Sequence, residues 1–151
     1  MNPGCTPFER RLAALVVGQV DFVTVGGAAC ALNGFVRTTD DVDILVASDR
    51  ANVERLLAAW GPPAGELVPA DFTDEEGAIR VIDEFPTNIF VRMGGRRLED
   101  LRGHVRHIEM AGVPVPYLSA EGLILLKQGS VRVKDQMDVA QLQRMAKKPA
   151  D

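Results

Sequence analysis

The side chains best suited to chemistry are two aspartates, Asp41 and Asp43, which are separated by one valine. In a β-strand, side chains two positions apart project from the same face, so we expect both carboxylates to lie together. Two neighbouring carboxylates repel each other unless they share a cation. Hard oxygen ligands suit magnesium, which proteins often hold with one or two carboxylates and substrate phosphates. The pair therefore predicts a site for Mg²⁺ or Mn²⁺.

A glycine pair, Gly26 and Gly27, lies between a β-prone segment at 22–25 and a short helical segment expected at 28–32. Glycine lets the backbone approach an anion closely, and the first N–H groups of a helix lack partners within the helix. The segment therefore suits the phosphates of a nucleoside triphosphate. A glycine pair alone is also what a tight strand-to-helix turn without any ligand requires.

The elements that must position these residues alternate between strands and helices. Thr6 and Glu9 form a capping box around Pro7, and Ser48-Asp49 and Ser119 cap two later helices. The order of elements predicts an α/β or α+β fold in which helices cover a mixed sheet. We expect helices at 7–17, 28–32, 49–60, 119–127 and from about 135, and strands at 22–25, 41–47, 78–82, 87–92, 107–110 and 113–117.

Length and composition restrict the class of protein. The chain has 151 residues, of which 46% are hydrophobic and 25% charged, so we expect one folded domain over 1–151. A formal net charge of −4 argues against nonspecific adhesion to nucleic acid. Five arginines between Arg92 and Arg106 are interpreted mainly as charges that balance acids elsewhere.

The cellular setting follows from what the sequence lacks. Cys5 and Cys30 are far apart and do not have the spacing of metal ligands, so we expect reduced thiols. Apolar runs are interrupted well before the ~18 residues that a membrane span needs. We therefore expect a cytoplasmic protein that does not enter a membrane.

The two motifs combine in an order that resembles the signature of the nucleotidyltransferase superfamily. The chain reads Val25-Gly26-Gly27, thirteen intervening residues, and then Asp41-Val42-Asp43-Ile44. The fuller pattern resembles small bacterial members related to abortive-infection type IV toxins. The resemblance implies the nucleotidyltransferase fold, a mixed β-sheet flanked by helices. The stretches that carry it, which together cover most of the chain, are 23–29, 37–46, 117–127 and 134–138.

The resemblance implies transfer of a nucleoside monophosphate from a triphosphate such as ATP to an acceptor hydroxyl, with pyrophosphate leaving. Asp41 and Asp43 would hold the metal. For Arg37 and Lys127 the alternative interpretation is a surface ion pair. Asp135 and Asp138 match the final helix of the related toxins, and for Asp135 the alternative interpretation is a helix cap. The implied nucleotide-binding residues are Gly26, Gly27, Arg37, Thr39 and Lys127.

Asn88 departs from the pattern of the superfamily. Members that transfer nucleotides usually carry a third acid on a later strand, and in the segment 86–91 Asn88 stands in that place. An amide oxygen can ligate a metal, but it is uncharged and cannot take a proton at neutral pH. Loss of a general base typically costs about 10²–10⁴-fold in rate. Asp83 and Glu84 are the candidate substitutes, with a turn role as the alternative for Asp83.

Two other interpretations stay open. The chain fits a catalytically impaired nucleotide-binding or interaction protein, for example one half of a toxin–antitoxin pair, with an antitoxin or a second copy as its partner. It fits less well the nucleophile loop of an aspartate-dependent phosphatase, because those acids follow an apolar strand and Asp41 and Asp43 precede one. The acceptor, whether a small molecule, an RNA end or a protein, has no recognisable signature.

Overall fold

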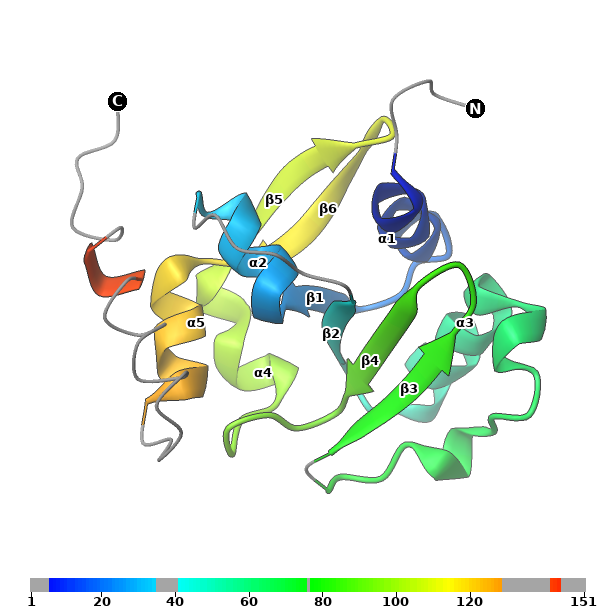
Figure 1. Ribbon diagram of the computed structural model, residues 1–151. Coiled ribbons are helices and arrows are strands. Elements are labelled where there is room, and N and C mark those ends of the chain that lie inside the picture. Colours follow the sequence, from blue (N-terminus) through cyan, green and yellow to red (C-terminus); the bar gives the residue numbers. More distant parts are fainter. Residues whose placement is uncertain (1–5, 35–40, 76, 129–141, 145–151) are drawn as a thin grey trace.

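A computed structural model describes residues 6–34, 41–75, 77–128 and 142–144 of the chain. The strands are β1 (Phe22–Val25), β2 (Val42–Val46), β3 (Ala78–Ile82), β4 (Pro86–Phe90), β5 (Val105–Met110) and β6 (Val113–Leu118). The helices are α1 (Pro7–Val17), α2 (Gly26–Leu32), α3 (Arg50–Trp60), α4 (Leu98–Leu101) and α5 (Ala120–Lys127), with 3-10 turns at Pro62–Ala64, Pro69–Asp71 and Arg102–His104. The expected mixed sheet flanked by helices is confirmed (Figure 1).

The strands form one mixed sheet in the order β3-β4-β2-β1-β6-β5. Strand β2 runs antiparallel to β1 and parallel to β4, and β1 runs parallel to β6. The pairs β3–β4 and β5–β6 are antiparallel hairpins at the two edges. This order places β2, and with it Asp43, in the middle of the sheet.

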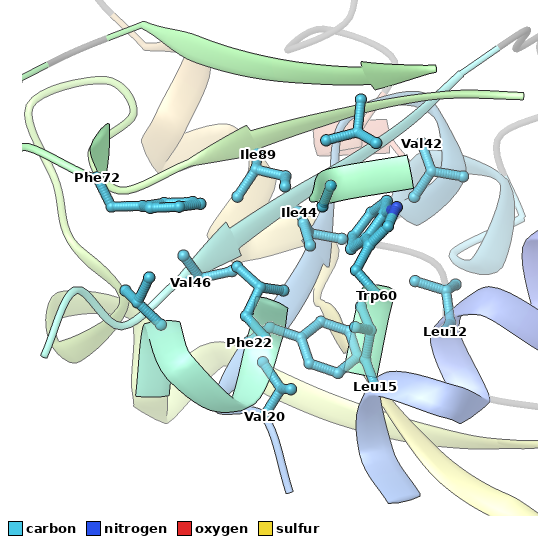
Figure 2. Packing of buried hydrophobic residues seen from close by; sticks show 14 of the residues in the cluster. Leu12, Leu15, Val20, Phe22, Val42, Ile44, Val46, Trp60, Phe72 and Ile89 are labelled. Carbon is cyan, nitrogen blue, oxygen red and sulfur yellow. The ribbon is translucent and has the colours of Figure 1, made fainter. Parts of the chain in front are cut away.

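Strand β2 separates two apolar cores because its side chains alternate between the faces of the sheet. Val42, Ile44 and Val46 pack with α1 and α3 on one face (Figure 2). Leu45 packs on the other face with residues of α2, α4 and α5. Full burial of a side chain of this size contributes roughly 1.5–3 kcal/mol, so the register of β2 is strongly fixed. Asp43 therefore has to face the side of α2 and α5.

The predicted caps of three helices are confirmed. The Thr6 hydroxyl accepts a hydrogen bond of 3.1 Å from the backbone N–H of Glu9 at the start of α1. Asp49 caps α3 through the Asn52 N–H at 3.1 Å, and Ser119 caps α5. A side-chain cap of this kind stabilises a helix by about 1 kcal/mol. Among the described residues, no helix combines the length and apolar character that a bilayer crossing requires.

Two elements differ from the prediction. Helix α2 begins at Gly26 itself, so the glycine pair forms the first helical turn and does not precede the helix. Helix α4 was not predicted, because its four residues are too few to show a helical period; its buried Leu98 and Leu101 hold it against the second core. Of the helix expected from about residue 135, the described residues include only 142–144, which are helical, and Leu142 is fully buried in the second core.

Candidate functional site

The two aspartates lie at the beginning of β2, next to the end of β1. Asp41 immediately precedes the strand and Asp43 is its second residue, paired in register with Val25 of β1. The intervening Val42 is fully buried on the opposite face. The structure thus brings both carboxylates to the face of the sheet that α2 and α5 cover.

Asn88 joins the two carboxylates. It is the Cα partner of Asp43 in the parallel pairing of β2 and β4. Its amide nitrogen donates to Oδ2 of Asp41 at 2.9 Å and to Oδ1 of Asp43 at 2.8 Å. One amide group therefore satisfies one oxygen of each acid and holds the acids at a fixed spacing.

Arg80 of β3 completes this polar network. It is paired in register with Asn88, and its Nη1 donates to the Asn88 amide oxygen at 3.1 Å. The same nitrogen lies 3.6 Å from Oδ2 of Asp41. Arg80 was not predicted as a site residue. The alternation of side chains along 78–82 and the short connection to β4 were sequence signals that could have placed it beside Asn88.

Gly26 abuts Asp43 at the junction of β1 and α2. Its φ of +65° lies in the left-handed region that favours glycine. A Cβ at this position would lie 2.9 Å from Cγ of Asp43 and closer still to Oδ2. Val25, the residue before α2, offers no side-chain hydrogen bond to the first turn of the helix. The glycine thus lets the backbone and the carboxylate meet without a side chain between them.

The electrostatics of Asp43 reflect a buried acid beside a second acid. Burial raises the pKa of Asp43, and the hydrogen bond from Asn88 lowers it in part. The negative charge of Asp41 raises the Asp43 pKa further, whereas the positive charges of Lys127 and Arg80 oppose that rise. Ionised Asp43 is therefore costly in this environment, and a bound cation would relieve that cost.

Of the other predicted site residues, the structure describes Lys127 but not those at 37, 39, 135 and 138. Lys127 is the last residue of α5, and its charge acts on Asp43, so it lies on the same side of the sheet as the acids. Arg37 and Thr39 lie outside the described residues, as do Asp135 and Asp138. The roles assigned to these residues stay predictions.

The suggestion that Asp83 or Glu84 completes the carboxylate pair is wrong. Asp83 forms an ion pair with Arg11 and Glu84 with Arg10, and both arginines belong to α1. Helix α1 covers the face of the sheet opposite to Asp43. The hairpin turn is held there because Phe85 is buried in the core of that face.

The arginines between Arg92 and Arg106 largely balance acids, as interpreted from the sequence. Arg92 and Arg97 both contact Asp74, with Arg92 at 3.0 Å. Arg102 donates to Asp21 at 3.1 Å. These pairs are largely exposed, so each contributes little to stability.

The donor set at β2 fits a divalent cation with hard oxygen preferences. Asp41 and Asp43 supply carboxylates, and Asn88 is the remaining oxygen-bearing neighbour. In the described part of the chain, no group of three or more His, Cys, Asp and Glu side chains is placed to hold a metal. Two carboxylates are enough for Mg²⁺, which usually keeps several waters or takes phosphate oxygens as further ligands. The residues present therefore fit Mg²⁺ bound together with a phosphate ligand.

The architecture matches a solved structure over nearly its whole length. A "putative nucleotidyltransferase" from Thermotoga maritima superposes with a TM-score of 0.53 and 17% identity, covering 92% of this chain and 89% of that one. This chain has the nucleotidyltransferase fold. An antigenic nucleotidyltransferase-like protein from Paracoccidioides brasiliensis gives a TM-score of 0.49 at 18% identity, covering 93% of this chain and 78% of that one.

Sequence comparisons add nothing to this assignment. Neither a protein-family model nor a curated protein sequence matches the chain. The nucleotidyltransferase fold expected from the glycine and aspartate motifs is confirmed by the structural match. The narrower resemblance to abortive-infection type IV toxins stays a prediction.

Proposed function

We propose that this protein is a magnesium-dependent nucleotidyltransferase that moves a nucleoside monophosphate from a triphosphate to an acceptor hydroxyl. The observation that carries the proposal is the contact of Gly26 with Asp43, which is one of two carboxylates on the same face of β2. A backbone without a side chain next to a metal-binding carboxylate leaves room for a phosphate that the metal also contacts. The nucleotidyltransferase fold of the chain supports the same activity.

The site residues would have two kinds of role, which are binding the metal and attracting the phosphates. Asp41 and Asp43 would hold Mg²⁺, which when bound supplies Lewis-acid polarisation of the phosphate and neutralises its charge. Gly26 would let the phosphates approach the backbone. Lys127, whose charge already acts on Asp43, would attract the triphosphate to the same side of the sheet.

The proton of the acceptor hydroxyl has no dedicated third acid to receive it among the described residues. Asn88 cannot take a proton at neutral pH. Within the described residues no third acid joins Asp41 and Asp43. The proton would therefore pass to one of these two carboxylates or to water, and we expect turnover to be slower by about the 10²–10⁴-fold that a dedicated base supplies.

The decisive test combines labelled nucleoside triphosphates with Mg²⁺ or Mn²⁺ and a panel of acceptors that includes small hydroxyl compounds, RNA ends and the protein itself. We expect pyrophosphate release and transfer of label, both lost in Asp41→Ala and Asp43→Ala. Asp74→Ala is the matched control, because Asp74 is an aspartate that pairs with Arg92 and Arg97, away from β2. Tight nucleotide binding without pyrophosphate release or transfer over the panel would contradict the proposal.

A second candidate function is nucleotide binding without turnover, as in an interaction protein or one half of a toxin–antitoxin pair. The amide of Asn88, bonded to both acids, is the observation that favours it. In that case calorimetry with ATP and Mg²⁺ would show binding that Asp41→Ala abolishes, while the wild-type protein would give no transfer. Robust transfer by the wild-type protein would remove this candidate.

A further inference from the structure

We propose that Asn88 and Arg80 restrict the carboxylate pair to a single divalent cation, and that Arg80 supplies a fixed positive charge in place of a second cation. The inference rests on the metal site of the proposed function and goes beyond it. Many enzymes that act on phosphates use two metal ions about 3.5–4 Å apart, which clamp the attacking and leaving oxygens. In this protein Asn88 bridges Asp41 and Asp43, and Arg80 contacts both Asn88 and Asp41.

Asn88 already engages one oxygen of each carboxylate. The amide nitrogen of Asn88 contacts Oδ2 of Asp41 and Oδ1 of Asp43, so it takes one oxygen from each acid. The other oxygen of Asp43, Oδ2, is the atom that lies nearest to Gly26. Asp43 thus directs one oxygen towards Asn88 and the other towards the glycine. A single cation bound on the glycine side leaves the bridge from Asn88 intact.

Charge also favours one cation. The two ionised acids contribute −2, Arg80 contributes +1 and Lys127, whose charge acts on Asp43, contributes a further +1, whereas Asn88 contributes nothing. The guanidinium of Arg80 carries a positive charge, and its Nη1 lies 3.6 Å from Asp41 Oδ2. One divalent cation turns the local charge from 0 to +2, and a second would raise it to +4, with no third acidic side chain grouped with the pair among the described residues to offset it. The charges around the pair therefore oppose a second divalent cation more strongly than the first.

Arg80 can also bind an anionic ligand. A guanidinium presents several N–H donors in a planar fork, which suits phosphate oxygens. Arg80 extends from the edge strand β3, and half of its side chain is exposed, so it can contact a ligand without leaving the network. It would thus act as a positioning residue for the anionic substrate on the Asn88 side, opposite Gly26.

The test counts Mn²⁺ ions bound to the full chain without nucleotide, using electron paramagnetic resonance of free and bound Mn²⁺. The double variant Asp41→Ala with Asp43→Ala defines the background from other surface acids. We expect one Mn²⁺ above background for the wild-type protein and two for Asn88→Asp, in which an amide becomes a carboxylate. Should Asn88→Asp not fold, Arg80→Glu adds a carboxylate beside Asp41 without altering Asn88, and it is also expected to bind two.

The affinity for the single ion tests the charge of Arg80. Arg80→Ala removes a positive charge that lies 3.6 Å from the Asp41 carboxylate, so we expect roughly tenfold tighter Mn²⁺ binding with the count still at one. Arg102→Ala is the matched control: its side chain is 52% exposed against 50% for Arg80, and it pairs with Asp21, which belongs to neither motif. We expect its Mn²⁺ affinity to stay within twofold of the wild-type value.

The outcomes separate this inference from the proposed function. Two Mn²⁺ ions or none on the wild-type protein, or an Arg80→Ala affinity equal to that of the control, would overturn it. One Mn²⁺ on the wild-type protein, two on Asn88→Asp and no nucleotidyl transfer would leave the one-cation site standing and remove the activity. Nucleotidyl transfer together with two Mn²⁺ ions on the wild-type protein would support the proposed activity and remove the one-cation site.

Discussion

Asp43 and Asn88 are direct neighbours in the register of β2 and β4, and the Asn88 amide donates a hydrogen bond of 2.8 Å to the Asp43 carboxylate. This bond lowers the pKa of Asp43, yet burial outweighs it and the net shift is upward. The side chain is thus kept in place by one neighbour and made costly to ionise by its surroundings. A pKa shifted by burial in this way is typical of residues that serve binding or catalysis and not stability.

Asp43→Asn is expected to stabilise the protein at neutral pH. Because burial raises the Asp43 pKa, the folded state binds more protons than the unfolded state between the unfolded pKa, about 3.9, and the higher folded value. Stability therefore falls as pH rises through this window and stays lower above it. Removing the charge should add about 0.5–2 kcal/mol at pH 7, measured by urea unfolding, and the gain should vanish below about pH 4.

Asp74→Asn is the control with the opposite sign. Hydrogen bonds from Arg92 and Arg97 lower the pKa of Asp74, so its charge stabilises the folded state above the unfolded pKa, and that contribution is lost as pH falls through the folded pKa. The variant should be no more stable than the wild-type protein at pH 7. Equal pH profiles for the two variants would contradict the environment described for Asp43.

Gly26→Ala is expected to damage both stability and metal binding. The left-handed φ of +65° costs a residue with a Cβ about 1–2 kcal/mol, and the added Cβ would push the Asp43 carboxylate away. Gly61→Ala is the matched control, because Gly61 has φ of +82° but no atom within 4 Å of an added Cβ. Urea unfolding should show a loss in both variants, whereas Mn²⁺ binding should weaken only in Gly26→Ala. Weakening in both variants would refute a specific role for the contact with Asp43.

The Asp83→Ala variant is expected to be less stable than the wild-type protein, with the site at β2 unaffected. Asp83 pairs with Arg11, whose guanidinium lies 4.5 Å from the centre of the Trp60 ring, and burial lowers the pKa of Arg11. Removing one partner of a mostly buried pair costs about 3–5 kcal/mol, because the remaining charge loses its compensation. Glu84→Ala, which breaks the exposed pair with Arg10, should cost under about 1 kcal/mol.

Thermal unfolding and Mn²⁺ titration of Asp83→Ala distinguish a structural from a catalytic role. A lower melting temperature with unchanged Mn²⁺ affinity is the expected pattern. A weaker Mn²⁺ affinity in a folded variant would mean that Asp83 acts at the carboxylate pair after all.

Added Mg²⁺ is expected to raise the melting temperature of the wild-type protein. A ligand that binds only the folded state stabilises it by about 2.7 kcal/mol at 100 times its dissociation constant. At this chain length, 1 kcal/mol corresponds to roughly 2–4 °C. The shift should disappear in Asp41→Ala and persist in Asp74→Ala, as measured by differential scanning calorimetry. An equal shift in both variants would place the stabilising ion elsewhere.

The local features of this protein follow from short stretches of its sequence. Strand parity placed Asp41 and Asp43 on one face, and the caps at Thr6, Asp49 and Ser119 fixed three helix starts. These features depend on residues only a few positions apart, so the sequence contains the information directly. The resemblance of the glycine and aspartate motifs to the nucleotidyltransferase signature also led to the right fold.

The surroundings of the carboxylate pair depend on how distant strands pack together. Arg80 reaches Asn88 through the β3–β4 hairpin. Asn88 reaches Asp43 through the pairing of β2 with β4, whose register is set by nonlocal packing. The same packing turned Asp83 towards Arg11 and away from the site. Side chains far apart in sequence meet according to which strand neighbours which and which face each core occupies. Those choices arise from the burial of both faces together, and no local pattern records them.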